Sequence, residues 1–155
     1  MKRLAKSLHS KGLKGRFLLD SNVFISYLKG DELADRAENV VKLIVDGVLE
    51  ALTSFMLYDD VISGLRSKGM KLGDIIQVLT AIASIPHTPL PVTPAIAINA
   101  LILYMQHGGS RKLHYFDTFH VATARFHELP MITSDTYVNE HQVNLGIRSI
   151  DLKKL

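Results

Sequence analysis

The sequence predicts an α/β fold, a three-layer α/β/α sandwich with a mainly parallel central sheet. Short apolar runs, of the kind found in buried strands, alternate along the chain with longer segments whose apolar residues recur at helical spacing. Strands that alternate with helices favour a parallel sheet covered by helices on both faces. An apolar fraction of 47% is enough to fill the core of such a fold.

The first half of the chain contains two expected strands and three expected helices. Residues 17–20 form a short apolar strand, and residues 23–28 form a helix that a glycine closes. Residues 32–49 have one apolar face at helical spacing. A second strand is expected at 50–53, where a threonine or serine is suited to cap a helix that runs to about residue 68.

The second half continues the alternation. A helix over 72–84 is followed by a proline-rich stretch, residues 86–91, which fits a short strand with turns because proline is disfavoured in helix interiors. Pro94 suits the first turn of a helix that two glycines end after residue 107. The remaining expected elements are one helix and two strands: residues 117–127, 130–133 and 147–150.

Length and composition limit the class of protein. At 155 residues the chain is expected to form one domain over residues 17–155, preceded by a basic arm at residues 1–16. It contains no cysteine, which excludes disulfides and thiolate metal sites. Its most apolar stretch, residues 95–105, is shorter than the ~20 residues that a membrane-spanning helix needs. We therefore expect a cytoplasmic protein with no membrane partner.

The basic arm is a candidate contact for nucleic acid. It carries six lysine or arginine residues and no acidic residue, and because the whole chain has a net charge of +3, residues 17–155 carry −3. Lys11, Lys14 and Arg16 are the members nearest the domain, and we expect them to contact phosphates. A solvated terminal tail accounts for the same charges.

Four aspartates stand where apolar segments begin or end: Asp20, Asp60, Asp117 and Asp135. Asp20 and Asp135 directly follow expected strands, and the carboxyl ends of parallel strands line the ligand-binding crevice of an α/β sheet. Asp60 and Asp117 lie on expected helices that can point into the same crevice. Converging carboxylates repel one another, and a divalent cation relieves that repulsion. The pattern indicates a metal site, and oxygen ligands favour Mg²⁺ or Mn²⁺ over zinc.

Each aspartate also has a purely structural explanation. Asp20 and Asp135 are suited to cap the helices that follow them, and Asp117 is favoured in the first turn of a helix by the helix dipole. Asp59 competes with Asp60, but Asp60 lies beside the apolar face of its helix, so we expect Asp60 to be the site residue. The joint pattern, rather than any single residue, supports the metal site.

Four short motifs occur in order: Asp20-Ser21-Asn22-Val23, then Asp60 followed by Gly64-Leu65, then Asp117 ahead of an alanine-rich helix, then Thr133-Ser134-Asp135. In this order and spacing the chain resembles the PIN-domain family, and most closely its VapC-type ribonuclease branch. The resemblance covers residues 17–150. It departs at one point, because the family usually has a glutamate where this chain has Asp60, whose side chain is one methylene shorter.

The resemblance implies a Mg²⁺- or Mn²⁺-dependent endoribonuclease that hydrolyses RNA phosphodiester bonds at the four aspartates, which serve as catalytic metal ligands. Polar residues beside the aspartates would orient water, a carboxylate or substrate: Asn22, Thr133 and Ser134. VapC-like proteins are commonly toxins held by a small antitoxin, and they often dimerise. An antitoxin protein and a homodimer are therefore implied besides RNA.

The sequence also allows other interpretations. His120 and His127 share a helix face but lack the His-x-x-x-His spacing of a zinc site, so we expect them to pack, with substrate contact as an alternative for His120. A haloacid-dehalogenase-type phosphatase requires a second aspartate where the chain has Asn22, and the sequence has no Gly-x-x-x-x-Gly-Lys-Ser/Thr nucleotide loop. The alternative that is not an enzyme is a PIN-like scaffold, with Asp60 in place of glutamate, that binds RNA or protein without cleaving it.

Overall fold

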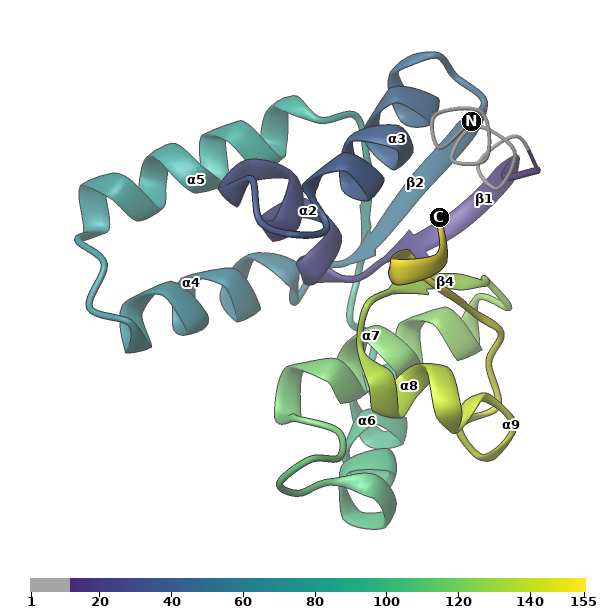
Figure 1. The fold of residues 1–155 in the computed structure, drawn as a ribbon. Helices are drawn as coiled ribbons and strands as arrows, with labels where there is room; N and C mark the ends of the chain where they lie inside the picture. Colours follow the sequence, from purple (N-terminus) through teal and green to yellow (C-terminus); the bar gives the residue numbers. More distant parts are fainter. Residues whose placement is uncertain (1–11) are drawn as a thin grey trace.

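The computed structural model describes residues 12–155, and in this range it confirms the expected α/β sandwich around a parallel sheet (Figure 1). The five strands described lie in the order β3-β2-β1-β4-β5. Their bounds are Gly15–Leu19 for β1, Leu49–Ser54 for β2, Thr88–Leu90 for β3, Met131–Thr133 for β4 and Ser149–Asp151 for β5. The chain builds outward from β1 through β2 to β3, then crosses to β4 on the other side of β1. This reversal of strand order between β1 and β4 is where ligands bind in open parallel sheets.

One face of the sheet is covered by four helices (Figure 1). They are α2 (Ser21–Lys29), α3 (Ala34–Val45), α4 (Leu57–Ser67) and α5 (Leu72–Ser84). Successive side chains of a strand point to opposite faces, and Phe17 and Leu19 of β1 join the core beneath these helices. Phe24 of α2 and Val61 of α4 are buried in the same core.

The opposite face is covered by α6 (Pro94–His107), α7 (Tyr115–Phe126), α8 (Thr136–Glu140) and α9 (Gln142–Leu145). Leu18, the residue between Phe17 and Leu19, points to this side and packs in a second core with Leu52 and Met131. The alternation of β1 side chains between two apolar cores explains why its short run is continuously hydrophobic. A 3₁₀ turn, η1 (Leu152–Lys154), ends the described chain.

Most element boundaries differ from the expected ones by a few residues, and three differences are the clearest. The helix expected over 32–49 is shorter: α3 ends at Val45, Gly47 has a φ of +71°, and Leu49 already pairs with β1. The helix expected from residue 117 begins at Tyr115, so the sequence prediction started it too late. Helix α9 was not expected, because its four residues are too few to show a helical period.

Within the described range, no helix combines the length and the apolar character that crossing a membrane requires. The expected basic arm falls mostly on residues 1–11, which lie outside the described residues.

Candidate metal centre

Neighbouring strands β1 and β4 bring two distant segments to one edge of the sheet. Leu19 of β1 is paired with Ile132 of β4, and the backbone N–H of Asp20 donates to the carbonyl of Ile132 at 3.1 Å. Asp20 follows β1 directly, and Thr133 is the last residue of β4. The carboxyl ends of both strands therefore meet where the strand order reverses, as expected for a binding crevice.

Asp20 is a buried carboxylate, only 2% exposed. Its Oδ2 accepts hydrogen bonds from Thr133 Oγ1 at 2.6 Å and Asn22 Nδ2 at 3.1 Å, and its Oδ1 accepts one from Ser21 N at 2.7 Å. Burial raises the pKa of Asp20 above its ordinary value, although nearby His120 and the Thr133 hydrogen bond oppose that rise. Ser21 is the first residue of α2, whereas a capping side chain normally serves the second or third N–H. Helix capping alone therefore does not explain Asp20.

The three residues expected to orient the site form one hydrogen-bonded network beside Asp20. Asn22 Nδ2 lies 3.2 Å from Thr133 Oγ1, and Asn22 Oδ1 accepts from the backbone N–H of Ser134 at 3.3 Å. Ser134 thus takes part through its backbone. Thr133 Oγ1 also accepts from the N–H of Asp135 at 3.0 Å. The network ties the start of α2 to the end of β4 and fixes the direction of the Asp20 carboxylate.

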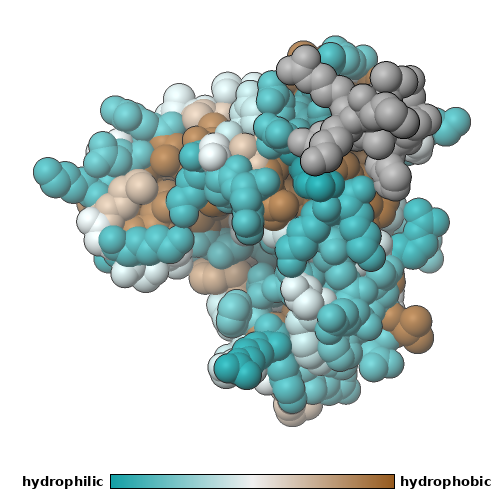
Figure 2. All heavy atoms as spheres, viewed as in Figure 1, coloured by the Kyte–Doolittle hydropathy of each residue, from teal (hydrophilic) through white to brown (hydrophobic). Residues whose placement is uncertain are grey.

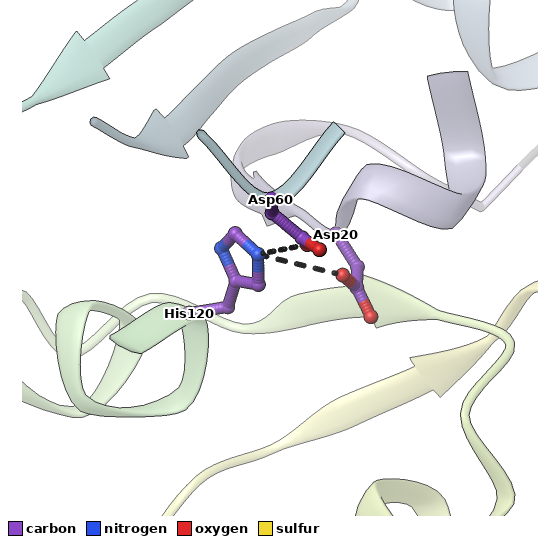
Figure 3. Close-up of side chains that lie close together, drawn as sticks. All are labelled: Asp20, Asp60 and His120. Atoms are coloured by element: carbon purple, nitrogen blue, oxygen red, sulfur yellow. Dashed lines mark hydrogen bonds and ion pairs between the residues drawn. The ribbon is translucent and has the colours of Figure 1, made fainter. Parts of the chain in front are cut away.

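Asp60 reaches the same place from α4, and His120 of α7 faces both Asp60 and Asp20 (Figure 3). His120 Nε2 lies 2.9 Å from Asp60 Oδ2 and 4.0 Å from Asp20 Oδ1. Ser21 Oγ donates to Asp60 Oδ2 at 2.8 Å. One ligand atom from each of Asp20, Asp60 and His120 lies within 4.8 Å of the other two. Asp59 is exposed, so Asp60 is the aspartate that joins the cluster.

His120 is the site residue that sequence reasoning missed. Its side chain is fully buried, and it contacts two carboxylates instead of merely packing. Burial by itself lowers the pKa of His120, but the hydrogen bond to Asp60 and the charges of Asp20, Asp60 and Asp117 outweigh it and raise the pKa overall. The signal available in the sequence was spacing, because a residue three positions after Asp117 lies on the same helix face.

Asp117 and Asp135 flank this cluster and also stabilise helix starts. Asp117 lies in the first turn of α7, where its Oδ2 accepts from the N–H of His114 at 2.9 Å. Burial, followed by the charges of Asp20 and Asp135, raises the pKa of Asp117 to about 7. Asp135 caps α8, since its Oδ1 accepts from the N–H of Val138 at 2.9 Å. Asp135 has the expected capping geometry, Asp117 has the expected place in a first turn, and the charge of Asp135 raises the pKa of Asp117.

The basic residues described from the arm lie at the far edge of the sheet. Arg16 stands at the start of β1, at the opposite end from Asp20, and its Nε lies 3.2 Å from a carboxylate oxygen of Glu50. Lys14 precedes the strand, and Lys11 lies outside the described residues. The structure therefore does not bring Lys14 or Arg16 to the carboxylates.

Other cations lie nearer the carboxylates. A surface hollow of about 380 Å³ includes Asp135 in its wall together with three basic side chains: Arg111, Lys112 and His114. A larger hollow of about 630 Å³ contains Arg125 and Arg148. Arg148 immediately precedes β5, which places the larger hollow toward the amino ends of the strands, away from the aspartates. Only the smaller hollow adjoins the candidate site.

The donor chemistry of the cluster fits a hard divalent cation. Burial disfavours negative charge on Asp20 and Asp117 and raises the pKa of both, and a nearby cation would favour their ionised forms. Four aspartates supply oxygen donors, which suit Mg²⁺ or Mn²⁺. Asn22 and Thr133 orient Asp20 by hydrogen bonds, in the way that residues bonded to metal ligands commonly orient them.

Comparison with known proteins bears on both the family and the fold. A family model described as PIN domain matches residues 17–142. The structure of VapBC2 from Rickettsia felis bound to a promoter DNA fragment aligns with a TM-score of 0.66 at 13% identity, covering 88% of this chain and 98% of that chain. VapBC-1 from nontypeable Haemophilus influenzae aligns with a TM-score of 0.61 at 20% identity, covering 90% and 100%. VapBC-5 from Mycobacterium tuberculosis, of a toxin-antitoxin family, gives 0.57 at 22% identity, covering 88% and 98%. A comparison with curated protein sequences finds no match.

Proposed function

Because the chain belongs to the PIN-domain family, we propose that it is a Mg²⁺- or Mn²⁺-dependent endoribonuclease that hydrolyses RNA phosphodiester bonds. The main supporting observation is the buried carboxylate of Asp20 at the point where strand order reverses. Thr133 and Asn22 hold this carboxylate in place. Asp60 lies near the Asp20 carboxylate, and His120 faces both. Asp117 and Asp135 flank the Asp20 carboxylate. Half-buried aspartates gathered around a buried carboxylate suit a cation-dependent hydrolase better than a structural core.

Each residue of the cluster has a part in this proposal. Asp20, Asp60, Asp117 and Asp135 would hold the cation, which when bound would supply positive charge to the phosphate and lower the pKa of a bound water. Thr133 and Asn22 keep the Asp20 carboxylate in one orientation. The attacking oxygen comes from water, and the ribose oxygen of the broken ester leaves. No side chain has to form a covalent bond with the substrate.

The RNA strand is proposed to pass over the hollow beside Asp135. Arg111 and Lys112 are exposed there and are available to phosphates, and His114 lies at the start of α7 next to Asp117. Cations next to a metal site would hold the strand while the cluster acts on one phosphodiester. The contact with Lys11, Lys14 and Arg16 stays a separate prediction for more distant parts of the RNA.

We further propose that the protein is the cytoplasmic toxin of a toxin-antitoxin pair and that it dimerises. The support is that the structural neighbours are toxin-antitoxin proteins. Hydrophobic side chains also gather on the surface over α2 and α5 (Figure 2), and Leu72 and Ile76 of α5 are among the exposed hydrophobic residues. Inhibition of RNA cleavage by the protein encoded next to this one would support the antitoxin, and sedimentation analysis would test the dimer.

The test of the nuclease proposal is cleavage of a labelled RNA in the presence of Mg²⁺ or Mn²⁺. Wild type is expected to cleave, and cleavage should fall to background with a chelator or in Asp20→Asn and Asp117→Asn, which keep side-chain size but lose a charge. Asp59→Asn, beside the site but exposed, is the matched control and should cleave like wild type. If wild type cuts no faster than Asp20→Asn, the ribonuclease proposal is wrong and the non-cleaving scaffold becomes the better description.

A further inference from the structure

His120 and Ser21 hold one oxygen of Asp60 from two different helices. Ser21 begins α2 and His120 lies on α7, and both side chains approach Asp60 Oδ2, at 2.8 Å and 2.9 Å. Within the described residues, the other carboxylate oxygen, Oδ1, accepts no hydrogen bond. Asp60 stands on α4, so its alignment with Asp20 depends on how three helices pack. The two hydrogen bonds fix that alignment and leave Oδ1 available.

The distances allow His120 either to bind a metal through Nε2 or to donate a hydrogen bond from Nε2 to Asp60. Its other ring nitrogen, Nδ1, distinguishes these two roles. Nδ1 is buried and has no hydrogen-bond partner among the described residues. A histidine that binds a metal through Nε2 carries its proton on Nδ1, and that N–H almost always donates to an acceptor. Here the N–H would be buried without an acceptor, which is costly. A proton on Nε2 instead donates to Asp60 and leaves on Nδ1 only a lone pair without a donor, and buried acceptors without a partner are less rare than buried donors without one.

We propose that His120 is a positioning residue, which donates its Nε2–H to Asp60 Oδ2 and, with Ser21, orients Asp60 so that its other oxygen can bind the cation. The inference rests on the proposed metal-dependent function. It assigns His120 a role outside the metal's ligand shell, although its nitrogen lies among the potential ligand atoms. The side chain of Asp60 is short and extends from a helix, so its direction is not fixed by the backbone alone. The hydrogen bonds from Ser21 and His120 fix that direction.

Nitrogen-15 NMR of histidine-labelled protein tests the hydrogen bond directly, with His120→Gln used to assign the signal. In the metal-free protein, the Nε2–H signal of His120 should be observed and should move in Asp60→Asn. It should keep its proton when diamagnetic Mg²⁺ is added to saturation. Transfer of the proton to Nδ1 upon Mg²⁺ addition, or a signal indifferent to Asp60→Asn, would overturn the proposal.

Two substitutions then separate positioning from simple packing. A glutamine side chain can place an N–H about where Nε2 lies, whereas asparagine reaches only about as far as Nδ1. We expect calorimetry to show that His120→Gln keeps Mn²⁺ affinity within about threefold of wild type, and that His120→Asn weakens it by about 10- to 100-fold. Circular dichroism checks that both variants fold.

Equal affinities in the two variants, whether both weakened or both unchanged, would contradict the positioning role. RNA cleavage is not measured in these experiments. An inactive wild type with the expected order of metal affinities would therefore remove the nuclease proposal and leave this inference standing, while cleavage by wild type without the expected order would do the reverse.

Discussion

At the scale of single residues, the site depends on keeping carboxylates where negative charge is disfavoured. Asp20 is buried, and the pKa values of both Asp20 and Asp117 are raised by burial. Thr133, Asn22 and Ser21 offset part of that cost for Asp20 by donating hydrogen bonds to it. In the metal-free protein the remaining cost favours the protonated forms, so protons and cations compete for the same oxygens.

This competition predicts how stability changes with pH. The pKa of Asp117 rises from an ordinary value of 3.8 to about 7 on folding, so its contribution to stability is complete below about pH 4 and is lost as pH rises through 7. The raised pKa values of Asp20 and His120 act in the same direction. Thermal denaturation in chelator should therefore show the free energy of unfolding falling between pH 4 and 8, with at most about 4 kcal/mol from Asp117.

Mg²⁺ should restore the lost stability most strongly above pH 7, where the carboxylates are ionised. Asp117→Asn, which cannot titrate, should show a shallower pH dependence in chelator. Two results would contradict the assignment of these pKa shifts. In chelator, the free energy of unfolding of wild type would rise from pH 4 to pH 8, or its pH dependence would equal that of Asp117→Asn.

At the scale of elements, the same aspartates begin helices and face the site. Asp135 shows the overlap most clearly, since its Oδ1 caps α8 while its charge raises the pKa of Asp117. Asparagine caps a helix about as well as aspartate but has no charge. Asp135→Asn should therefore retain the free energy of unfolding of wild type within about 0.5 kcal/mol and lose Mn²⁺ affinity, whereas Asp135→Ala should lose about 1 kcal/mol as well.

Denaturant unfolding and calorimetry on both variants check this prediction. Unchanged Mn²⁺ affinity in Asp135→Asn would show that Asp135 is a helix cap and no more. The comparison settles for one residue the alternative that the sequence left open for three of the four aspartates.

The hydroxyl of Thr133 links the side chains that meet at the carboxyl ends of β1 and β4. Thr133 Oγ1 donates to Asp20 and accepts from Asp135 N and Asn22, and Thr133→Val removes it with little change of shape. We expect the free energy of unfolding to fall by about 1–3 kcal/mol and Mn²⁺ affinity to weaken. Thr123→Val is the matched control, because Thr123 is equally buried but bonds only within its own helix. Equal loss of stability with full Mn²⁺ affinity in both variants would contradict an orienting role for Thr133.

The sequence predicted the elements that have a strong pattern and missed what depends on packing between them. Asp20 and Asp135 were placed correctly because each follows an apolar strand, and parallel strands end at one edge. Asp60 was favoured over Asp59 from helix phase, and in the structure Asp60 lies beside Asp20 and His120 whereas Asp59 is exposed. The contact of His120 with Asp60 could not be predicted, because it depends on how α7 packs against α4. Arg111 and Lys112 stand in a loop, where no periodicity marks them.

At the scale of the whole molecule, the aspartates and the proposed RNA path lie at the carboxyl ends of the strands, and the larger hollow lies toward their amino ends. Arg111 and Lys112 lie beside Asp135, whereas Arg125 and Arg148 line the larger hollow toward the opposite edge. All four side chains are exposed. Removing two positive charges beside Asp135 should therefore weaken RNA binding more than removing two at the larger hollow.

Replacing Arg111 and Lys112 by glutamine in the non-cleaving Asp20→Asn protein should weaken single-stranded RNA binding. It should also reduce the slope of log K against log salt by about 1.4, since each lost phosphate contact removes about 0.7. The same change at Arg125 and Arg148 should alter neither. Fluorescence anisotropy over a salt series makes the measurement, and equal slopes for the two double variants would place the RNA elsewhere.

Calorimetric titration with Mn²⁺ measures whether Asp20 and its neighbours bind a divalent cation. We expect measurable binding by wild type, equal binding by the Asp59→Asn control, and binding weakened by at least about 10-fold in Asp20→Asn. A wild type that binds no Mn²⁺, or an Asp20→Asn variant that binds Mn²⁺ as tightly as wild type, would show that these aspartates are not a cation site.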